Sequence, residues 1–100
     1  MAVGKEQTME KTTGRPQPFG AAVEQDRINF SVQVPRGKEC ALLLYRKGKT
    51  RPEARFEMPE EEGVGEVRFL AVQGIDAEKY EYNFEINGEV TIDPYVRELT

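Results

Sequence analysis

Residues 79–95 have the sequence KYEYNFEINGEVTIDPY, and this stretch decides the fold of the chain. Between residues 80 and 86, aromatic and β-branched side chains alternate with polar ones, as is typical of a strand with one buried face. Asn87-Gly88 follows, and both residues tolerate the positive φ that a two-residue type I′ turn requires. Residues 89–92 return as the partner strand until Asp93-Pro94, because proline has no N–H for the ladder. The stretch predicts a β-hairpin that buries Tyr80, Tyr82, Phe84 and Ile86 and exposes Glu81, Asn83 and Glu85.

The same period of two occurs on the N-terminal side of the hairpin. Residues 27–34 predict a strand with Ile28, Phe30, Val32 and Val34 inside and Asn29, Ser31 and Gln33 outside. Further strands are expected at 19–23, 40–45, 54–58 and 66–72, the last with Val67 and Phe69 on one side and Arg68 on the other. About six or seven short strands separated by turn signals indicate an all-β fold, an immunoglobulin-like antiparallel β-sandwich.

The N-terminal segment differs from the rest of the chain. Residues 1–17 are mostly polar, have no usable periodicity and end in Arg15-Pro16-Gln17. Such a composition is typical of a flexible leader or linker. The sequence therefore predicts a leader at 1–17 and one β-sandwich domain at 18–100.

Composition narrows the function classes. The net charge of −4 argues against nucleic-acid binding, for which a basic stripe is expected, and no apolar run approaches the roughly 20 residues of a membrane helix. The chain has no histidine, which is the commonest general base and metal ligand, and its one cysteine, Cys40, is interpreted as a buried, inert thiol. Ser31 has no base to activate it. We therefore predict no enzyme activity for this chain by itself, and no catalytic, metal-binding or cofactor-binding residues.

Three stretches, in this order, carry a resemblance to a known family. The first is Pro18-Phe19-Gly20-Ala21 ahead of RINFSV at 27–32, the second is ECALLLY at 39–45, and the third runs from Tyr80-Glu81-Tyr82 to Asp93-Pro94-Tyr95-Val96-Arg97. Together they resemble the carbohydrate-binding module of the isoamylase N-terminal and glycogen-binding kind. That sandwich precedes the catalytic barrel of isoamylase- and pullulanase-type debranching enzymes.

The resemblance implies roles for particular residues. Asp93, Pro94, Tyr95 and Arg97 would form the linker toward, and the docking contact with, an α-amylase-type barrel of the same polypeptide. Family members that grip α-glucan stack tryptophans on sugar faces, whereas this chain has no tryptophan and carries Val90 at the hairpin position. Asn83 stands in place of a sugar-contacting lysine, so that Asn83 and Asn87, both expected to be exposed, are left to hydrogen-bond a glucan.

Three functions follow as expectations. The first is a non-catalytic accessory domain of a glycogen- or starch-debranching glycoside hydrolase, packed on the barrel, with weak or lost sugar binding. The alternatives are an autonomous glycogen- or starch-binding module and an immunoglobulin-like protein-interaction domain. The lack of a secretory signal and of a cysteine pair favours a cytoplasmic location.

Overall fold

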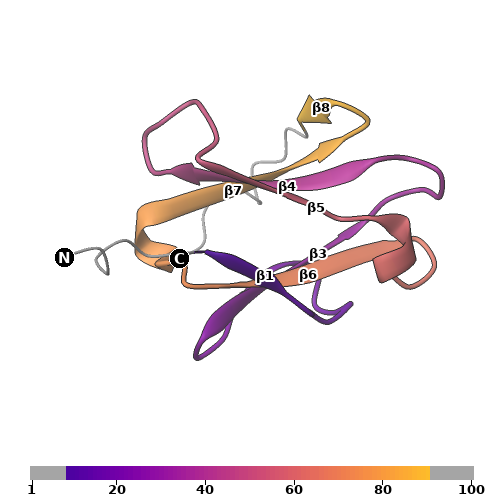
Figure 1. The fold of residues 1–100 in the computed structure, drawn as a ribbon, viewed down its shortest axis with the longest axis horizontal. Coiled ribbons are helices and arrows are strands. Elements are labelled where there is room, and N and C mark those ends of the chain that lie inside the picture. Colours follow the sequence, from indigo (N-terminus) through magenta and orange to yellow (C-terminus); the bar gives the residue numbers. More distant parts are fainter. Residues whose placement is uncertain (1–8, 91–100) are drawn as a thin grey trace.

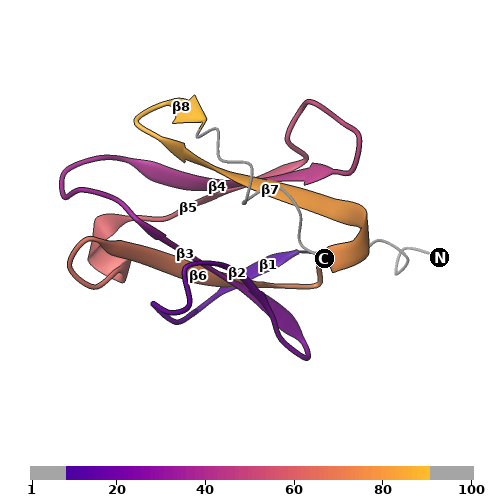
Figure 2. The same ribbon diagram turned by 180° about the vertical axis from the view of Figure 1, so that it is seen from behind.

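The computed structural model describes residues 9–90 and shows two antiparallel sheets packed face to face (Figures 1 and 2). One sheet has the strand order β1-β6-β3-β2 and the other β5-β4-β7-β8. The strands are β1 (Glu10–Thr12), β2 (Gly20–Val23), β3 (Arg27–Gln33), β4 (Cys40–Arg46), β5 (Ala54–Glu57), β6 (Val67–Gln73), β7 (Tyr80–Ile86) and β8 (Glu89–Val90). Two 3₁₀ turns, η2 (Glu60–Glu62) and η3 (Ala77–Lys79), complete the described elements. The all-β sandwich is confirmed. No described helix is long and apolar enough to cross a membrane.

The core lies between the central strands of the two sheets. Phe30 of β3 meets Tyr82 of β7 edge to face, with ring centroids 5.3 Å apart, and Tyr82 meets Phe84 at 5.6 Å. The alternation predicted for β3 and β7 is confirmed on this face, since Ile28, Phe30, Val34, Tyr80, Tyr82 and Phe84 are all buried. Cys40 is buried with its Sγ 3.9 Å from Sδ of Met58, and burial raises the pKa of its thiol to about 11. The thiol therefore stays protonated at neutral pH, in agreement with its interpretation as a core residue.

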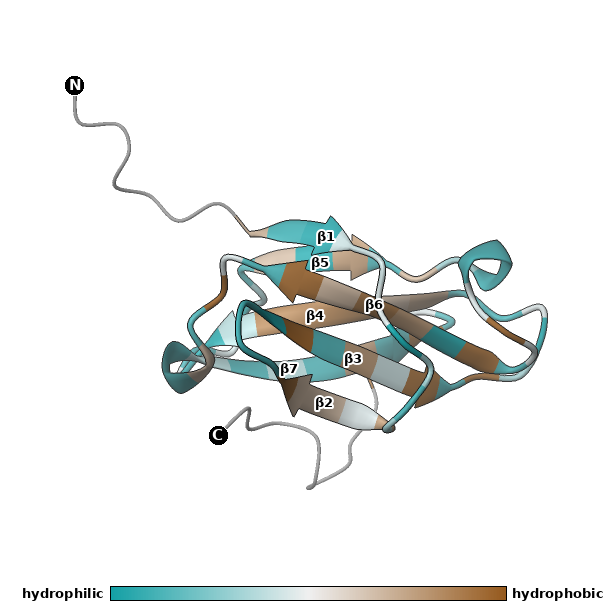
Figure 3. Cartoon of the chain, turned by 90° about the horizontal axis from the view of Figure 1, so that it is seen from below, coloured by the Kyte–Doolittle hydropathy of each residue, from teal (hydrophilic) through white to brown (hydrophobic). Residues whose placement is uncertain are grey.

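The predicted leader is wrong for residues 9–17. Glu10–Thr12 form β1, which pairs with β6 in the register Glu10↔Gln73 and Thr12↔Ala71. Residues 13–18, which we call the strap, then connect β1 to β2 at the opposite edge of the same sheet (Figure 3). Residues 10–12 have no amphipathic pattern of their own. They form a strand because of a tertiary contact, since their ladder partner β6 lies far along the chain.

The strap also explains why two side chains predicted outside are buried. The Arg15 N–H donates to Oδ1 of Asn29 at 2.6 Å, and Nδ2 of Asn29 donates to the Arg15 carbonyl at 3.0 Å. The Ser31 hydroxyl donates to the Pro16 carbonyl at 2.6 Å. The outer face of β3 is thus covered by backbone that satisfies its polar groups, as buried polar groups require.

Candidate functional site

The hairpin turn is fixed to the neighbouring loop by Asn87. Asn87 has φ 52° and Gly88 has φ 82°, as the predicted type I′ turn requires. The Asn87 N–H donates to the Glu39 carbonyl at 2.9 Å, and its Oδ1 accepts the Glu39 N–H, also at 2.9 Å. Asn87 is exposed, as predicted, but its acceptor oxygen already serves the fold. Its Nδ2 is the group left to reach a ligand.

An open groove of about 550 Å³ lies beside this turn. Its walls are Pro35, Lys38, Ile86, Asn87, Glu89 and Val90. Val90, 42% exposed, is one of the apolar residues that it presents to solvent. The described lining therefore combines an aliphatic surface with an ammonium, a carboxylate and an amide, and none of these residues between 9 and 90 contributes an aromatic ring.

Asn83 lies outside this groove, and the prediction that it is exposed is wrong. It sits in the middle of β7 opposite Leu43 of β4, with 5% of its surface exposed. Leu43 and Tyr45 on the same face of β4 are buried as well, so this face is not open to solvent here. Asn87 is four residue steps along the chain from Asn83, or about 13 Å at 3.3 Å per residue. The groove therefore contains Asn87 but not the buried Asn83.

The four predicted linker and docking residues, Asp93, Pro94, Tyr95 and Arg97, lie outside the described residues. Their role stays a prediction.

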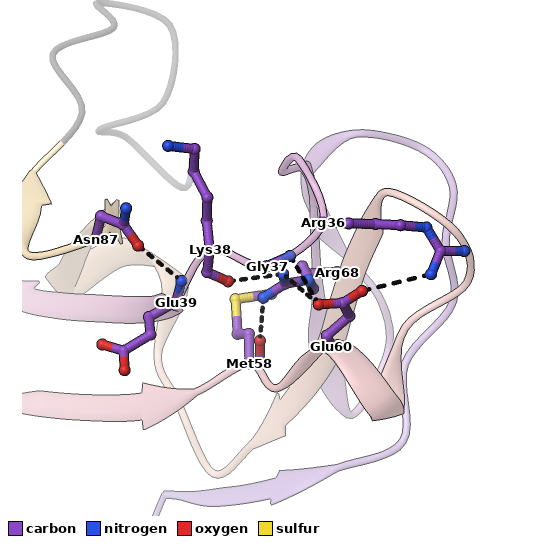
Figure 4. A network of polar contacts seen from close by, with 8 residues as sticks. All are labelled: Arg36, Gly37, Lys38, Glu39, Met58, Glu60, Arg68 and Asn87. Carbon is purple, nitrogen blue, oxygen red and sulfur yellow. Dashed lines mark hydrogen bonds and ion pairs between the residues drawn. The ribbon is translucent and has the colours of Figure 1, made fainter.

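A buried arginine, Arg68, lies on the face of β6 opposite Val67 and Phe69, as predicted, and holds one wall of the groove (Figure 4). Arg68 of β6 is 1% exposed and shares the inner face with Leu70 and Val72. Its guanidinium donates to the Met58 carbonyl at 3.0 Å and to the Lys38 carbonyl at 2.7 Å. Glu60 of η2 lies 3.7 Å from the same guanidinium and accepts the Gly37 N–H at 2.9 Å.

This network clamps the loop at residues 35–38, which carries Pro35 and Lys38 of the groove. Arg36 adds an exposed ion pair to Glu60 at 3.5 Å. A signal for the arrangement was present in the sequence, since Arg68, Leu70 and Val72 also alternate. Which face of the strand is the inner one stayed open in the sequence, because a fully buried arginine is rare unless its donors find acceptors.

A second polar cluster lies at the opposite end of β7. The Tyr80 hydroxyl donates to Glu53 at 2.6 Å, while Arg46 donates to both the Tyr80 oxygen (3.2 Å) and Glu53 (3.3 Å). The hydrogen bond from Tyr80 lowers the pKa of Glu53, and burial followed by the bond to Glu53 raises the pKa of Tyr80. Both shifts favour the same pair of protonation states, an ionised Glu53 carboxylate and a protonated Tyr80 hydroxyl. The described residues contain no group of three histidine, cysteine or carboxylate side chains that could hold a metal ion.

We expect this cluster to make stability depend on pH. Because the pKa of Glu53 is lower in the folded state, its contribution is present above the ordinary glutamate pKa of about 4.3 and is lost as pH falls below it. Tyr80→Phe should therefore lower the melting temperature at pH 7, and the difference from the wild type should shrink between about pH 5 and pH 3. Thermal unfolding followed by circular dichroism tests this. Glu53→Gln is the control, because it removes the titrating carboxylate but keeps an acceptor oxygen, so in that background the effect of Tyr80→Phe should not vary with pH. A Tyr80→Phe effect that is constant with pH in the wild-type background would contradict the prediction.

Comparisons with known proteins agree with the β-sandwich fold. The family model for carbohydrate-binding module 48, the isoamylase N-terminal domain, matches residues 18–96. Among solved structures, the chain is similar to pullulanase type I from Bacillus subtilis str. 168 complexed with maltose, with 28% identity and a TM-score of 0.56. That match covers 75% of this chain and 10% of the pullulanase chain. Among curated proteins no sequence matches. Since the family model covers most of the chain, the protein belongs to the carbohydrate-binding module 48 family.

Proposed function

We propose that this chain is a non-catalytic accessory domain of an α-glucan-debranching glycoside hydrolase, packed on the catalytic barrel, in which sugar binding is weak or lost. The family membership and the likeness to part of a pullulanase support the proposal that the chain is a domain of a debranching enzyme. The proposal extends to a cytoplasmic location, which the single buried thiol favours.

The observation that carries the proposal is that the residues lining the hairpin groove within the described range 9–90 include no aromatic ring. The C–H faces of glucose need a flat, exposed ring to stack on, and Val90 offers only two methyl groups. Phe19 is the only exposed aromatic side chain among residues 9–90, and it precedes β2, which belongs to the other sheet. With Asn83 buried, the described residues leave Asn87, Lys38 and Glu89 as polar partners in the groove, too few to hold a hydrated sugar tightly.

A single substitution should restore a binding surface. Val90→Trp places an indole in the groove beside Asn87, and we expect it to strengthen maltoheptaose binding by about tenfold over the wild type. Isothermal titration and affinity electrophoresis in glycogen measure the difference. Val64→Trp is the matched control, because Val64 is also an exposed valine, 61% exposed, but lies outside the groove. Equal effects of both variants would mean that the groove is not the sugar site.

The alternative, an autonomous glycogen- or starch-binding module, predicts a different result for the wild type. If the unmodified domain bound maltoheptaose with a Kd of about 10 µM, this alternative would replace the proposal. The packing part is tested separately by the coding sequence downstream of Thr100. It should encode an α-amylase-type barrel, and deleting the domain from that polypeptide should lower the melting temperature of the barrel.

A further inference from the structure

The outer strands of the two sheets differ in charge. Within residues 9–90, β1, β2, β5 and β8 each have a strand on one side only. Three of them carry charged side chains: Glu10 and Lys11 on β1, Arg55 and Glu57 on β5, and Glu89 on β8. The fourth, β2, has the sequence GAAV and carries none (Figure 3). Since charged residues on an edge strand discourage pairing with another chain, β2 is the one described edge without that protection.

Exposed apolar side chains mark both ends of β2. Phe19, just before the strand, is 55% exposed, and Val23 at its end is 56% exposed. They are two of the four large hydrophobic residues that are exposed in the described part of the chain. The nearest acidic group, Glu24, forms an ion pair with Arg15, which leaves this edge electrically neutral.

The backbone of β2 points alternate groups away from the sheet. At the turn into β3, the Glu24 N–H donates to the Arg27 carbonyl at 2.8 Å, and Ala22 is the register partner of Asn29. Hydrogen-bonded and non-hydrogen-bonded pairs alternate along an antiparallel ladder. The N–H and C=O groups of Ala22 therefore face β3, and those of Ala21 and Val23 face outward.

We propose that β2 is a self-association edge, where a second copy of this chain adds its own β2 antiparallel and joins the two four-stranded sheets into one. In a two-fold pairing centred on Ala22, Ala21 of each copy exchanges N–H···O bonds with Val23 of the other. The outward N–H groups of Ala21 and Val23, two in each copy, then all donate hydrogen bonds. The small, uncharged side chains of the strand are complementary to themselves, and the two-fold axis closes the assembly as a dimer.

The size of the contact sets its strength. A pairing of four residues from each copy buries less than the roughly 1,200 Å² of a standard stable complex. The dimer is therefore weak and reversible, and it forms at high protein concentration.

Sedimentation equilibrium between about 20 µM and about 1 mM tests the proposal. The wild type should dimerise in this range, and Val23→Lys should raise the dissociation constant at least about tenfold, because the pairing would bury the new charge. Val64→Lys is the matched control, since it adds the same charge at an exposed valine outside β2 and should leave dimerisation unchanged. A wild type that stays monomeric, or equal effects of the two lysines, would overturn the proposal.

Amide hydrogen exchange adds a readout specific to the edge. At the higher concentration the amides of Ala21 and Val23 should exchange more slowly, whereas that of Ala22, already bonded to β3, should not change. Protection confined to β5 or β8 would assign association to another edge and overturn the proposal. Protection of β2 that occurs only when the domain is joined to a longer polypeptide would instead make it an intramolecular docking edge.

Discussion

Arg68→Met should lower the free energy of unfolding by about 3–5 kcal/mol. Methionine fills a similar volume but donates no hydrogen bonds, so the carbonyls of Met58 and Lys38 lose their partner inside the fold. Glu60 loses its buried counter-charge as well. Since small domains are stable by about 5–15 kcal/mol, much of the total would be lost. Urea unfolding followed by circular dichroism measures it.

Arg36→Met is the matched control for this prediction. It removes an arginine that contacts the same carboxylate of Glu60, but the side chain of Arg36 is exposed. Exposed ion pairs contribute about 0–1 kcal/mol, so the control should stay close to the wild type. Arg68→Lys should fall between the two, because lysine keeps the charge but cannot reproduce the planar fork. Similar losses for Arg68→Met and Arg36→Met would show that the buried guanidinium does not hold the loop.

Gly14→Ala should destabilise the domain by about 3 kcal/mol through the strap. A Cβ at this position would lie 2.5 Å from Oδ1 of Asn29 and 2.5 Å from the carbonyl carbon of Leu70. No rotamer change relieves a clash with backbone, so the strap must lift. Lifting breaks its hydrogen bonds to Asn29 and Ser31, whose side chains are buried.

Gly48→Ala provides the comparison for Gly14→Ala. A Cβ on Gly48 meets nothing within 4 Å, but the residue has φ 84°, so only its backbone conformation resists alanine, at about 1 kcal/mol. Urea unfolding gives both losses, and amide exchange of Arg15 reports directly on the strap, since this N–H donates to Asn29. If Gly14→Ala were as stable as the wild type and Arg15 stayed protected, the close approach at Gly14 would be wrong.

Local patterns were enough to predict the hairpin and the core faces of β3 and β7. The turn type follows from Asn87-Gly88 alone, and the apolar residues of β7 alternate without interruption. Of the groove, Asn87 and Val90 were found by the same pattern and by the family resemblance. In each case the information lies within a few neighbouring residues.

The features that the sequence did not predict depend on distant contacts. β1 is a strand because β6 offers it a partner, and alternation cannot tell that the strap covers Asn29 and Ser31. For β6 the choice of inner face depended on whether Arg68 could be buried, which only the carbonyls of two other loops decide. Asn83 points to the predicted side, but solvent does not reach it.

The pairing of β1 with β6 also sets an order of events during synthesis. Because β1 is synthesised well before Ala71, Val72 and Gln73 of β6, the first described strand has no ladder partner until most of the described domain has left the ribosome. Contacts this distant in sequence form slowly and late, since a long loop must close before they stabilise the chain. We expect β1 and the strap to be the last elements to join the nascent fold and the first that a protease removes from it.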